Sequence, residues 1–333
     1  MPDKARWSPG EGRAALVTGA QGFIGSWLAQ RLLDEGAQVI VPRRDCPPDS
    51  RFRTEGIEQG CTVVLADLQD YASLVRILNE HDVSTVFHLA AQTIVGTANR
   101  SPLSTFEANV RGTYNLLEAC RTVGEQGDPV ERIVVASSDK AYGSHETLPY
   151  REDFALQPRY PYDVSKACAD MIARSYAFTY EMPVAVTRFA NIYGGGDLNW
   201  SRIVPETCRA LVQGDRPVIR SDGSPERDYL YVEDAVGAYL AVAGSLDRPE
   251  LRGRAWNAGW GAPLSVLEVV DSLARVSGRH LEPDIRGSGT PHGEIDRQFL
   301  DSTAIRDELG WKPSLALDEG LERTFAWYEQ RLA

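Results

Sequence analysis

Two side chains that could share the work of a proton transfer lie four residues apart, the phenol of Tyr162 and the ammonium of Lys166. On a helix this spacing places both side chains on one face. A lysine cation beside a tyrosine stabilises phenolate and lowers its pKa, so Tyr162 is a candidate base that takes a hydroxyl proton while hydride leaves the same carbon. The pair alone has little specificity, because tyrosine and lysine are common on helices. It gains specificity beside a site for a hydride-accepting cofactor.

Such a cofactor site is indicated by Thr18-Gly19-Ala20-Gln21-Gly22-Phe23-Ile24-Gly25, which follows a hydrophobic run and opens a helical pattern. Gly19 permits a tight turn, Gly22 lets the backbone approach a pyrophosphate, and Gly25 lets helix and strand pack closely. The helix that begins at Phe23 and Ile24 would turn its first N–H groups toward the anion. A glycine-rich turn without a ligand is the competing interpretation. The order of strand, turn and helix favours a dinucleotide.

The choice between NAD and NADP depends on the residues about 20 positions after the glycines, where a carboxylate usually selects a free ribose 2′-hydroxyl. That place holds Pro42-Arg43-Arg44-Asp45. Arg43 and Arg44 suit a 2′-phosphate and favour NADP, whereas Asp45 leaves NAD open. Two solvated surface arginines are a further alternative. Asp67-Leu68 follows the next expected strand. Asp67 either forms a hydrogen bond with the adenine edge or caps a helix.

These side chains need a scaffold, and the chain predicts a Rossmann-type, doubly wound parallel sheet with helices on both faces. Short β-branched runs alternate with helical patterns up to about residue 189. The expected strands are Ala14–Thr18, Gln38–Pro42, Thr62–Ala66, Thr85–Leu89, Arg132–Ser137 and Val184–Phe189. The expected helices include Tyr71–Leu78, Leu103–Val123 and Tyr162–Tyr180, beside the helix that opens at Phe23.

After Tyr193 glycines and prolines separate shorter elements, which predicts a smaller, interleaved C-terminal α/β substrate domain. Tyr229–Val232 and Asp234–Gly244 are expected to form a strand and a helix that return to the first domain. We therefore expect residues 12–192, plus about 229–257, to form the NAD(P)-binding domain. Residues 193–228 and 258–333 would bind substrate, with helices at Ser265–Val276, Ser302–Leu309 and Leu317–Gln330.

Composition excludes several classes of protein. Hydrophobic residues at 43% and charged residues at 25% match a globular chain, not a disordered or fibrous one. The net charge of −12 repels nucleic acid and anionic membranes, so an anionic ligand needs a local basic pocket. The five cysteines form no CxxC pair, and no cluster has metal-ligand spacing, so no metal is expected. Without a membrane-length apolar run or a signal region, the expected location is the cytoplasm.

Motifs along nearly the whole chain resemble the extended short-chain dehydrogenase/reductases, and within them the nucleotide-sugar epimerases and 4,6-dehydratases. Besides the glycine loop and the Tyr162/Lys166 pair, they are His88-Leu89-Ala90-Ala91-Gln92, Asn109-Val110-Arg111-Gly112-Thr113, Ser137-Ser138, Asn191, Arg227-Asp228-Tyr229 and Leu309-Gly310-Trp311-Lys312-Pro313. The resemblance implies a tightly bound NAD(P), a nucleotide-diphosphate sugar as substrate and a homodimer formed through the long helices. It also implies that Leu89, Ala90 and Ala91 contact cofactor and that Gln92 contacts substrate.

The segment after the fifth expected strand, Ser138-Asp139-Lys140, bears on the subgroup. Dehydratases of this family carry a hydroxyl residue, then Asp, then Glu, whereas 4-epimerases place small or apolar residues there. Asp139 fits the dehydratases, and Lys140 resembles the Asp-Lys pairing of the CDP-glucose 4,6-dehydratase branch. Two further segments resemble that branch, Gly194-Gly195-Gly196-Asp197 and Pro291-His292-Gly293-Glu294. The generic form of Arg227–Val232 leaves the nucleotide open.

The mechanism implied by the resemblance begins when Tyr162 removes the C4 hydroxyl proton, with Ser138 bonding the same oxygen. The resulting ketone acidifies the C5 proton, and Asp139, protonated, assists the departure of the C6 hydroxyl. Lys140 is either a neutral base for the C5 proton or a charged stabiliser of the enolate. The expected product is a 4-keto-6-deoxy sugar. The alternatives are an NAD(P)-dependent 4-epimerase and a non-catalytic dinucleotide-binding regulator.

A sugar diphosphate in an acidic protein requires donors aimed into the cleft. By resemblance, Asn191, Arg227 and Arg297 match phosphate contacts, with Arg202 and Arg220 as further candidates. Surface salt bridges are the alternative for the arginines. Asn109 either holds the backbone beneath the site or touches ligand, and we expect His88 to be structural.

Overall fold

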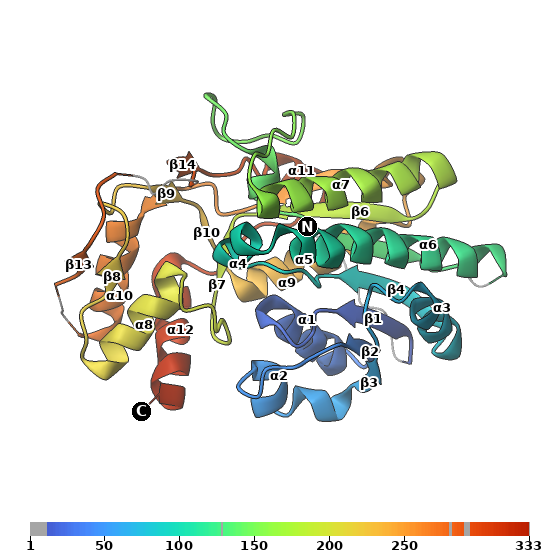
Figure 1. Cartoon of the computed structure of the whole chain (residues 1–333), viewed down its shortest axis with the longest axis horizontal. Helices are drawn as coiled ribbons and strands as arrows, with labels where there is room; N and C mark the ends of the chain where they lie inside the picture. The colour runs from blue at the N-terminus through green and yellow to red at the C-terminus, as the bar shows by residue number, and fades with distance from the viewer. Residues whose placement is uncertain (1–11, 128, 280–281, 290–293, 333) are drawn as a thin grey trace.

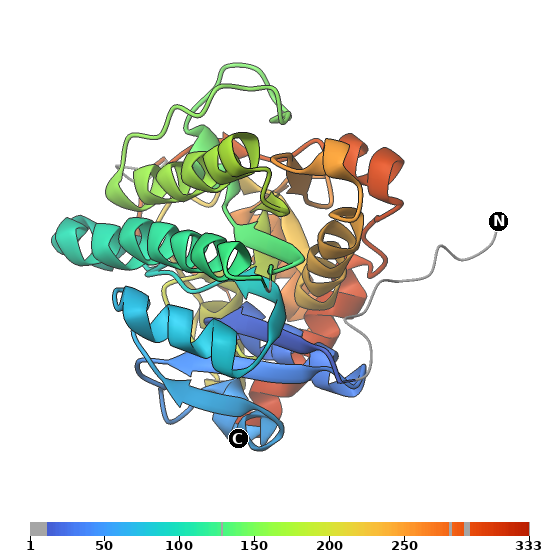
Figure 2. The ribbon, with the colours of Figure 1, turned by 90° about the vertical axis from the view of Figure 1, so that its right-hand side faces the viewer.

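The computed structural model describes residues 12–127, 129–279, 282–289 and 294–332. Its centre is a seven-stranded parallel sheet with strand order β11-β6-β5-β4-β1-β2-β3 (Figures 1 and 2). Every residue of β1 and β6 is buried, as expected for a sheet covered on both faces. The strands are β1 (Ala14–Thr18), β2 (Gln38–Arg43), β3 (Thr62–Leu65), β4 (Val83–His88), β5 (Arg132–Ala136), β6 (Val184–Phe189) and β11 (Ala255–Ala258).

Helices cover both faces of this sheet, because alternate strand side chains point to opposite sides. Ala15 and Val17 of β1 belong to one buried cluster, and Leu16 belongs to the other. Helices α1 and α9 pack on the first face, and α3, α6 and α7 on the second (Figure 1). Their bounds are α1 Phe23–Asp34, α3 Tyr71–Glu80, α6 Gly112–Glu125, α7 Pro161–Tyr180 and α9 Val232–Ser245. The arrangement confirms the doubly wound α/β fold.

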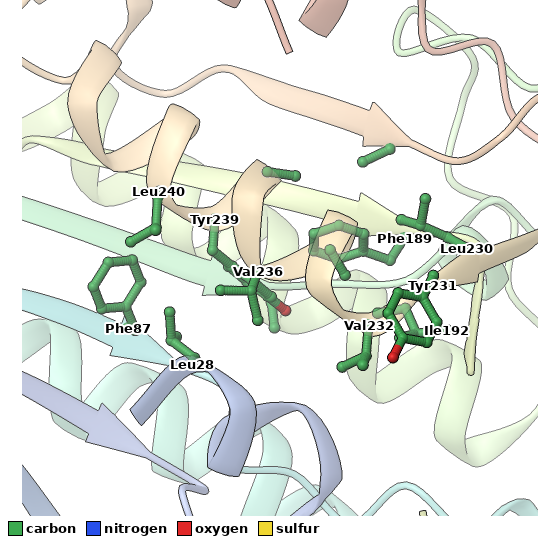
Figure 3. Close-up of a cluster of buried hydrophobic side chains, with 14 of the residues drawn as sticks. Leu28, Phe87, Phe189, Ile192, Leu230, Tyr231, Val232, Val236, Tyr239 and Leu240 are labelled. Atoms are coloured by element: carbon green, nitrogen blue, oxygen red, sulfur yellow. The ribbon is translucent and has the colours of Figure 1, made fainter. Parts of the chain in front are cut away.

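The first face joins segments that are far apart in the sequence. Figure 3 shows Leu28 of α1 and Phe87 of β4 beside Val236 and Leu240 of α9, and all four are buried. Helix α9 therefore returns to the sheet after the chain has left it. Strand β11 follows and pairs with β6, with Trp256 opposite Thr187. This interleaving matches the expected fold class.

The chain outside the main sheet forms a smaller lobe around three helices, α8, α10 and α12 (Figure 1). Helix α10 begins where the sequence predicts, because Ser265 and Glu268 form a reciprocal capping box. The helices are α8 Ile203–Gln213, α10 Val266–Ser277, α11 Thr303–Leu309 and α12 Leu317–Leu332. The short strands are β7 Asn191–Tyr193, β8 Val218–Ile219, β9 Glu226–Arg227, β10 Tyr229–Tyr231, β12 Leu264–Ser265, β13 Asp284–Ile285 and β14 Arg297–Gln298, paired as β10-β7, β12-β9-β14 and β13-β8.

The long helix expected over Leu103–Val123 is interrupted. Helix α5 (Pro102–Phe106) passes into a π-helical turn, Glu107–Arg111, before α6 begins at Gly112. Because Gly112 has no side chain, α6 can lie close to Leu68 in the loop after β3. A Cβ at Gly112 would be 3.1 Å from Leu68 Cβ. The remaining elements of the described residues are α2 (Arg51–Thr54), α4 (Val95–Arg100) and the 3₁₀ turns η1 (Ile57–Gly60), η3 (Asp139–Tyr142) and η4 (Pro249–Leu251), of which η3 matters for the site. Among the described residues, no helix has both the length and the apolar character needed to cross a membrane.

Candidate active site

A cavity of about 1100 Å³ lies at the carboxyl ends of the parallel strands, between the sheet and the smaller lobe. This is the edge at which open α/β sheets bind ligands. Most of the residues singled out from the sequence line it: Gly19, Gly22, Phe23, Ile24, Gly25, Arg44, Asp67, Leu68, Leu89, Ala90, Ala91, Gln92, Ser138, Asp139, Lys140, Tyr162, Lys166, Asn191, Arg202, Arg220 and Arg227. Arg43 and Arg297 lie outside this lining.

The glycine loop has the close packing that its spacing predicts. Gly19 adopts a φ of +76°, and a Cβ on Gly25 would lie 2.2 Å from the Gly19 carbonyl oxygen. Helix α1 starts at Phe23, and the residue at its N-cap, Gly22, has no side chain that could bond the first N–H groups. These groups therefore remain available to an anion. Thr18 Oγ1 accepts from the N–H groups of Leu89 and Ala90, each at 3.1 Å, which ties the β1 loop to the β4 loop. The residues therefore fit a dinucleotide pyrophosphate.

His88 has a structural role. Its Nδ1 lies 2.8 Å from Thr18 Oγ1 and its Nε2 lies 2.9 Å from Thr113 Oγ1. Burial, reinforced by the positive charge of Lys166, lowers the pKa of His88 to about 3, so the ring is neutral at physiological pH. A neutral imidazole between two hydroxyl groups fixes the end of β4 beneath the cavity.

The arginines expected to select the cofactor are both paired with carboxylates. Arg43 forms an ion pair with Glu58, and Arg44 Nη2 lies 3.0 Å from Asp45 Oδ2. Asp67 lines the cavity and also accepts from Gln69 N at 3.0 Å, so it combines a turn-capping bond with access to the site. The structure thus leaves no unpaired guanidinium at Arg43 to meet a 2′-phosphate.

Helix α7 presents Tyr162 and Lys166 to the cavity from its first two turns, and Pro161 begins the helix. Ser138 lies close enough to the Tyr162 phenol to act on its pKa, which it lowers. The ammonium of Lys166 donates to the Ala136 carbonyl at 2.6 Å, and burial lowers its pKa to about 8. The shift of the Tyr162 pKa is opposite to the lowering expected from Lys166, because burial, the largest cause, raises the pKa of Tyr162.

Turn η3 carries the second pair of predicted catalytic residues, immediately after β5. Asp139 is buried, and Ser138 Oγ donates to its Oδ1 at 3.0 Å. Burial raises the pKa of Asp139 despite Lys140, Ser138 and Arg227, which act in the opposite direction. Lys140 Nζ forms an ion pair with Glu294 at 3.0 Å. A buried carboxyl group and a lysine in an ion pair therefore lie next to each other on one turn.

Asn109 holds the backbone next to the site. Its Oδ1 accepts from Gln92 N at 2.6 Å, and its Nδ2 donates to Gln92 O at 3.0 Å and to Ser165 Oγ at 2.9 Å. The π-helical turn brings this amide inward to join the β4 loop to helix α7. Of the two interpretations that the sequence left open, the structure supports the positioning one.

The four candidate phosphate arginines have different surroundings. Arg202 binds Asp197 at 2.7 Å and the Ile192 carbonyl at 2.8 Å, and Arg227 donates to two backbone carbonyls and approaches Glu294 at 3.4 Å. Arg220 approaches the Ser201 carbonyl at 3.4 Å. Arg297 forms an exposed ion pair with Glu226. The cavity thus gathers Arg202, Arg220 and Arg227, while Arg297 lies outside it.

Two acidic residues were not assigned roles from the sequence, Glu294 in the cavity lining and Asp163 next to Tyr162. Glu294 ends the segment Pro291-His292-Gly293-Glu294, and Asp163 lies between Tyr162 and Lys166. Both residues stand in motifs that the sequence singled out, but nothing in the sequence indicated a role for their carboxyl groups. Burial raises the pKa of Asp163 to about 6, with Glu294 and Asp139 adding to it and Lys140 opposing it. Among the described residues, no group of three or more His, Cys, Asp or Glu could hold a metal ion.

Comparison with known proteins places the chain in a family. A family model described as GDP-mannose 4,6 dehydratase matches residues 16–324. The chain belongs to this family. UDP-glucose 4-epimerase of Mycolicibacterium smegmatis is 33% identical to this chain and covers 95% of it and 98% of its own length. CDP-glucose 4,6-dehydratase of Salmonella typhimurium is 30% identical, over 99% of this chain and 93% of its own length.

Solved structures of the family have the same fold. UDP-glucose 4-epimerase of Thermotoga maritima, determined with UDP-glucose, superposes with a TM-score of 0.86 at 28% identity, over 96% of this chain and 100% of that one. DesIV, a dTDP-glucose 4,6-dehydratase from Streptomyces venezuelae determined with NAD, gives 0.83 at 28% identity, over 95% and 97%. The family therefore includes both epimerases and 4,6-dehydratases at similar distances from this chain.

Proposed function

We propose that this family member is a nucleotide-sugar 4,6-dehydratase that converts an NDP-hexose such as CDP-glucose to the NDP-4-keto-6-deoxyhexose. The observation that carries the proposal is Asp139, a buried carboxyl with a raised pKa that bonds Ser138 and lies close to Tyr162. A protonated carboxyl at this place can give its proton to a departing hydroxyl group. A 4-epimerase expels no hydroxyl and has no need of such an acid.

The chain's own groups divide the reaction between them. NAD, bound at the glycine loop, would accept hydride from C4 and return it to C6, and its positive ring would offset the burial that raises the Tyr162 pKa. Tyr162 takes the C4 hydroxyl proton while Ser138 orients that oxygen. Asp139 then protonates the departing C6 hydroxyl. Arg227, with Arg202 and Arg220, holds the diphosphate against the overall negative charge of the protein.

For the cofactor we propose NAD. The expected preference for NADP depended on Arg43 and Arg44 being free to meet a 2′-phosphate. Both form ion pairs, with Glu58 and Asp45 respectively. The DesIV relative was determined with NAD. Affinity for the two cofactors, measured by calorimetry, tests this choice.

A 4-epimerase is the second candidate function, favoured by the 33% identity to UDP-glucose 4-epimerase of M. smegmatis. It would use the same oxidation at C4 and then return hydride to the opposite face of C4. A non-catalytic dinucleotide-binding regulator is the third. The joint placement of Ser138, Asp139, Tyr162 and Lys166 around one cavity argues against it.

The product distinguishes these functions. The purified protein is incubated with CDP-, TDP-, GDP- and UDP-hexoses, and the products are examined by mass and by the alkali-induced absorbance of a 4-keto-6-deoxy sugar. The dehydratase gives a product that has lost one water. Accumulation of the C4 epimer with unchanged mass would reject the dehydratase, and no turnover of any hexose would favour the regulator.

Asp139→Asn tests the acid directly. The amide keeps the shape of the side chain but has no proton to give to the C6 hydroxyl, so we expect oxidation at C4 to continue and water loss to fall by about 10²-fold or more. Bound reduced cofactor, followed by absorbance, should then persist during turnover. Unchanged water loss in this variant would remove Asp139 from the mechanism.

We also propose the domain boundaries and the homodimer that the sequence predicts. Residues 12–192, with about 229–257, would bind the dinucleotide, and residues 193–228 and 258–333 the sugar nucleotide. A homodimer through the helices around Leu103–Val123 and α7 is supported by large apolar side chains exposed on them: Leu103, Tyr114, Met171, Phe178 and Tyr180. Light scattering of the purified protein tests the dimer.

A further inference from the structure

One carboxylate approaches the catalytic turn from a distant part of the chain. Glu294 Oε2 lies 3.0 Å from Lys140 Nζ and 3.4 Å from Arg227 Nη2, and the Glu294 side chain lines the cavity. Lys140 and Arg227 are mostly buried, whereas Glu294 is about one third exposed toward the cleft. Both contacts use the same oxygen, so Oε1 takes part in neither ion pair.

The proposed elimination needs a base as well as an acid, because the C5 proton must leave as the C6 hydroxyl departs. Asp139 is the proposed acid, and burial raises its pKa, so a different group has to take the C5 proton. Lys140 Nζ already donates to a carboxylate at 3.0 Å, and this ion pair makes Lys140 a poor base. The turn that follows β5 therefore supplies an acid and a cation but no base.

The other carboxyl groups that line the cavity are committed elsewhere. Asp45 and Asp67 lie at the cofactor end, bonded to Arg44 and to the Gln69 backbone. Asp197 accepts from Arg202 at 2.7 Å and from the Asn199 backbone at 3.0 Å. Among the carboxyl groups that line the cavity, Glu294 is the one beside both the catalytic turn and a phosphate-binding arginine.

Glu294 is also in the protonation state that a base requires. Burial acts to raise its pKa, but Lys140 and Arg227 lower it below the usual value, so the carboxylate is ionised. A substrate diphosphate that binds Arg227 would compete with Glu294 for this cation. Substrate binding would then free the carboxylate and increase its basicity at the moment when it is needed.

We propose that Glu294 is the base that removes the C5 proton, while Lys140 remains a cation that stabilises the enolate. This inference rests on the proposed dehydratase function. The C5–H bond breaks, its proton passes to Glu294, and its electron pair forms the enolate with the C4 ketone. The C5=C6 double bond then forms as the C6–O bond breaks, and the hydroxyl leaves as water with the proton of Asp139. Glu294 returns its proton to C5 as hydride is delivered to C6, so the carboxylate is regenerated. The proton that Tyr162 took from the C4 hydroxyl passes to Asp139, so each group ends the cycle in its starting state.

The test compares full-length Glu294→Gln with the wild-type protein. Each is assayed on an NDP-hexose with hydrogen or deuterium at C5. Loss of the base should slow water loss by about 10²-fold or more and make the C5–H cleavage rate-limiting, so the deuterium isotope effect on water loss should rise. Substrate affinity, measured by calorimetry, should stay equal or increase, because a competing carboxylate has left Arg227. Glu294→Asp should recover part of the rate.

Glu308→Gln is the matched control, since Glu308 is paired with Arg254 at 2.7 Å, is similarly exposed and lies outside the cavity lining. It should leave the rate and the isotope effect unchanged. An unchanged isotope effect in Glu294→Gln, with only a higher KM, would reduce Glu294 to a clamp and overturn the inference. A wild-type product that is the C4 epimer would instead reject the proposed function itself.

Discussion

Two carboxyl groups of the same cleft have pKa values that move in opposite directions. Burial raises the pKa of Asp139, whereas Lys140 and Arg227 overcome burial and lower that of Glu294. Opposed shifts of this kind assign an acid and a base to neighbouring groups of one chemical type. At the scale of single residues, these opposed shifts support the proposed roles of Asp139 as proton donor and Glu294 as proton acceptor.

Tyr162→Phe tests the first proton transfer. The variant keeps the ring that fills the end of α7 but loses the hydroxyl that takes the C4 proton, so kcat should fall by about 10²- to 10⁴-fold. Tyr160→Phe, two residues earlier and outside the cavity lining, is the control and should retain its rate. Circular dichroism checks that both variants fold. Near-wild-type turnover of Tyr162→Phe would show that another group is the base.

At the scale of elements, the sequence predicts best where burial dictates the residue types. Strands β1 and β6 have the bounds expected from the sequence, because each is a short, mainly apolar segment rich in valine or alanine and is buried throughout. The π-helical turn over Glu107–Arg111 was not predicted, because the apolar pattern runs through it without a break. Its cause is tertiary, since Asn109 bonds the Gln92 backbone and Ser165, which are distant in sequence.

Gly25→Ala tests the packing of α1 on β1. The added Cβ would lie 2.2 Å from the Gly19 carbonyl oxygen and 2.9 Å from Ala20 Cα, so the glycine loop must move. We expect affinity for NAD, measured by calorimetry, to fall at least about tenfold, together with a lower melting temperature. Gly124→Ala in α6 is the control, because its Cβ would have ordinary contacts at 3.5 Å and alanine favours the helix. Equal NAD affinity of both variants would contradict this account of the loop.

The whole molecule reconciles a net charge of −12 with an anionic ligand by gathering cations in one cavity. Lys140, Lys166, Arg202, Arg220 and Arg227 all line it, as the composition requires of any site for a diphosphate. The motifs predicted most members of this cavity individually. They did not predict that Glu294 would meet Lys140, because the two are 154 residues apart and only the assembled lobes bring them together.

Asp163→Asn tests how much the burial of the Asp163 carboxyl group, next to Tyr162, lowers the free energy of unfolding. The pKa of Asp163 rises from 3.8 in the unfolded chain to about 6 in the fold, so the folded state is penalised when the group ionises. The penalty is absent below about pH 4, grows as the pH rises to 6, and then stays constant at about 3 kcal/mol at most. Asp163→Asn should therefore raise the free energy of unfolding at pH 8, and its advantage should shrink toward pH 5.

Urea denaturation at the two pH values measures this difference. Asp271→Asn, an exposed carboxylate on α10, is the control and should change the free energy of unfolding by less than about 0.5 kcal/mol at either pH. A variant of Asp163 that is less stable than the wild type at pH 8 would mean that the ionised carboxylate makes a net favourable interaction in the fold.

The pairing of β11 with β6 limits how this protein can be divided. Val186 N of β6 donates to Arg254 O at 3.0 Å, and Gly253 N donates to Val184 O at 2.7 Å, so a fragment ending at residue 192 would leave that border of the sheet open. Open borders invite pairing with other chains and aggregation. Exchanging the smaller lobe with that of a relative would therefore require several splice points, because the chain leaves the main sheet after β6 and returns to it in α9 and β11.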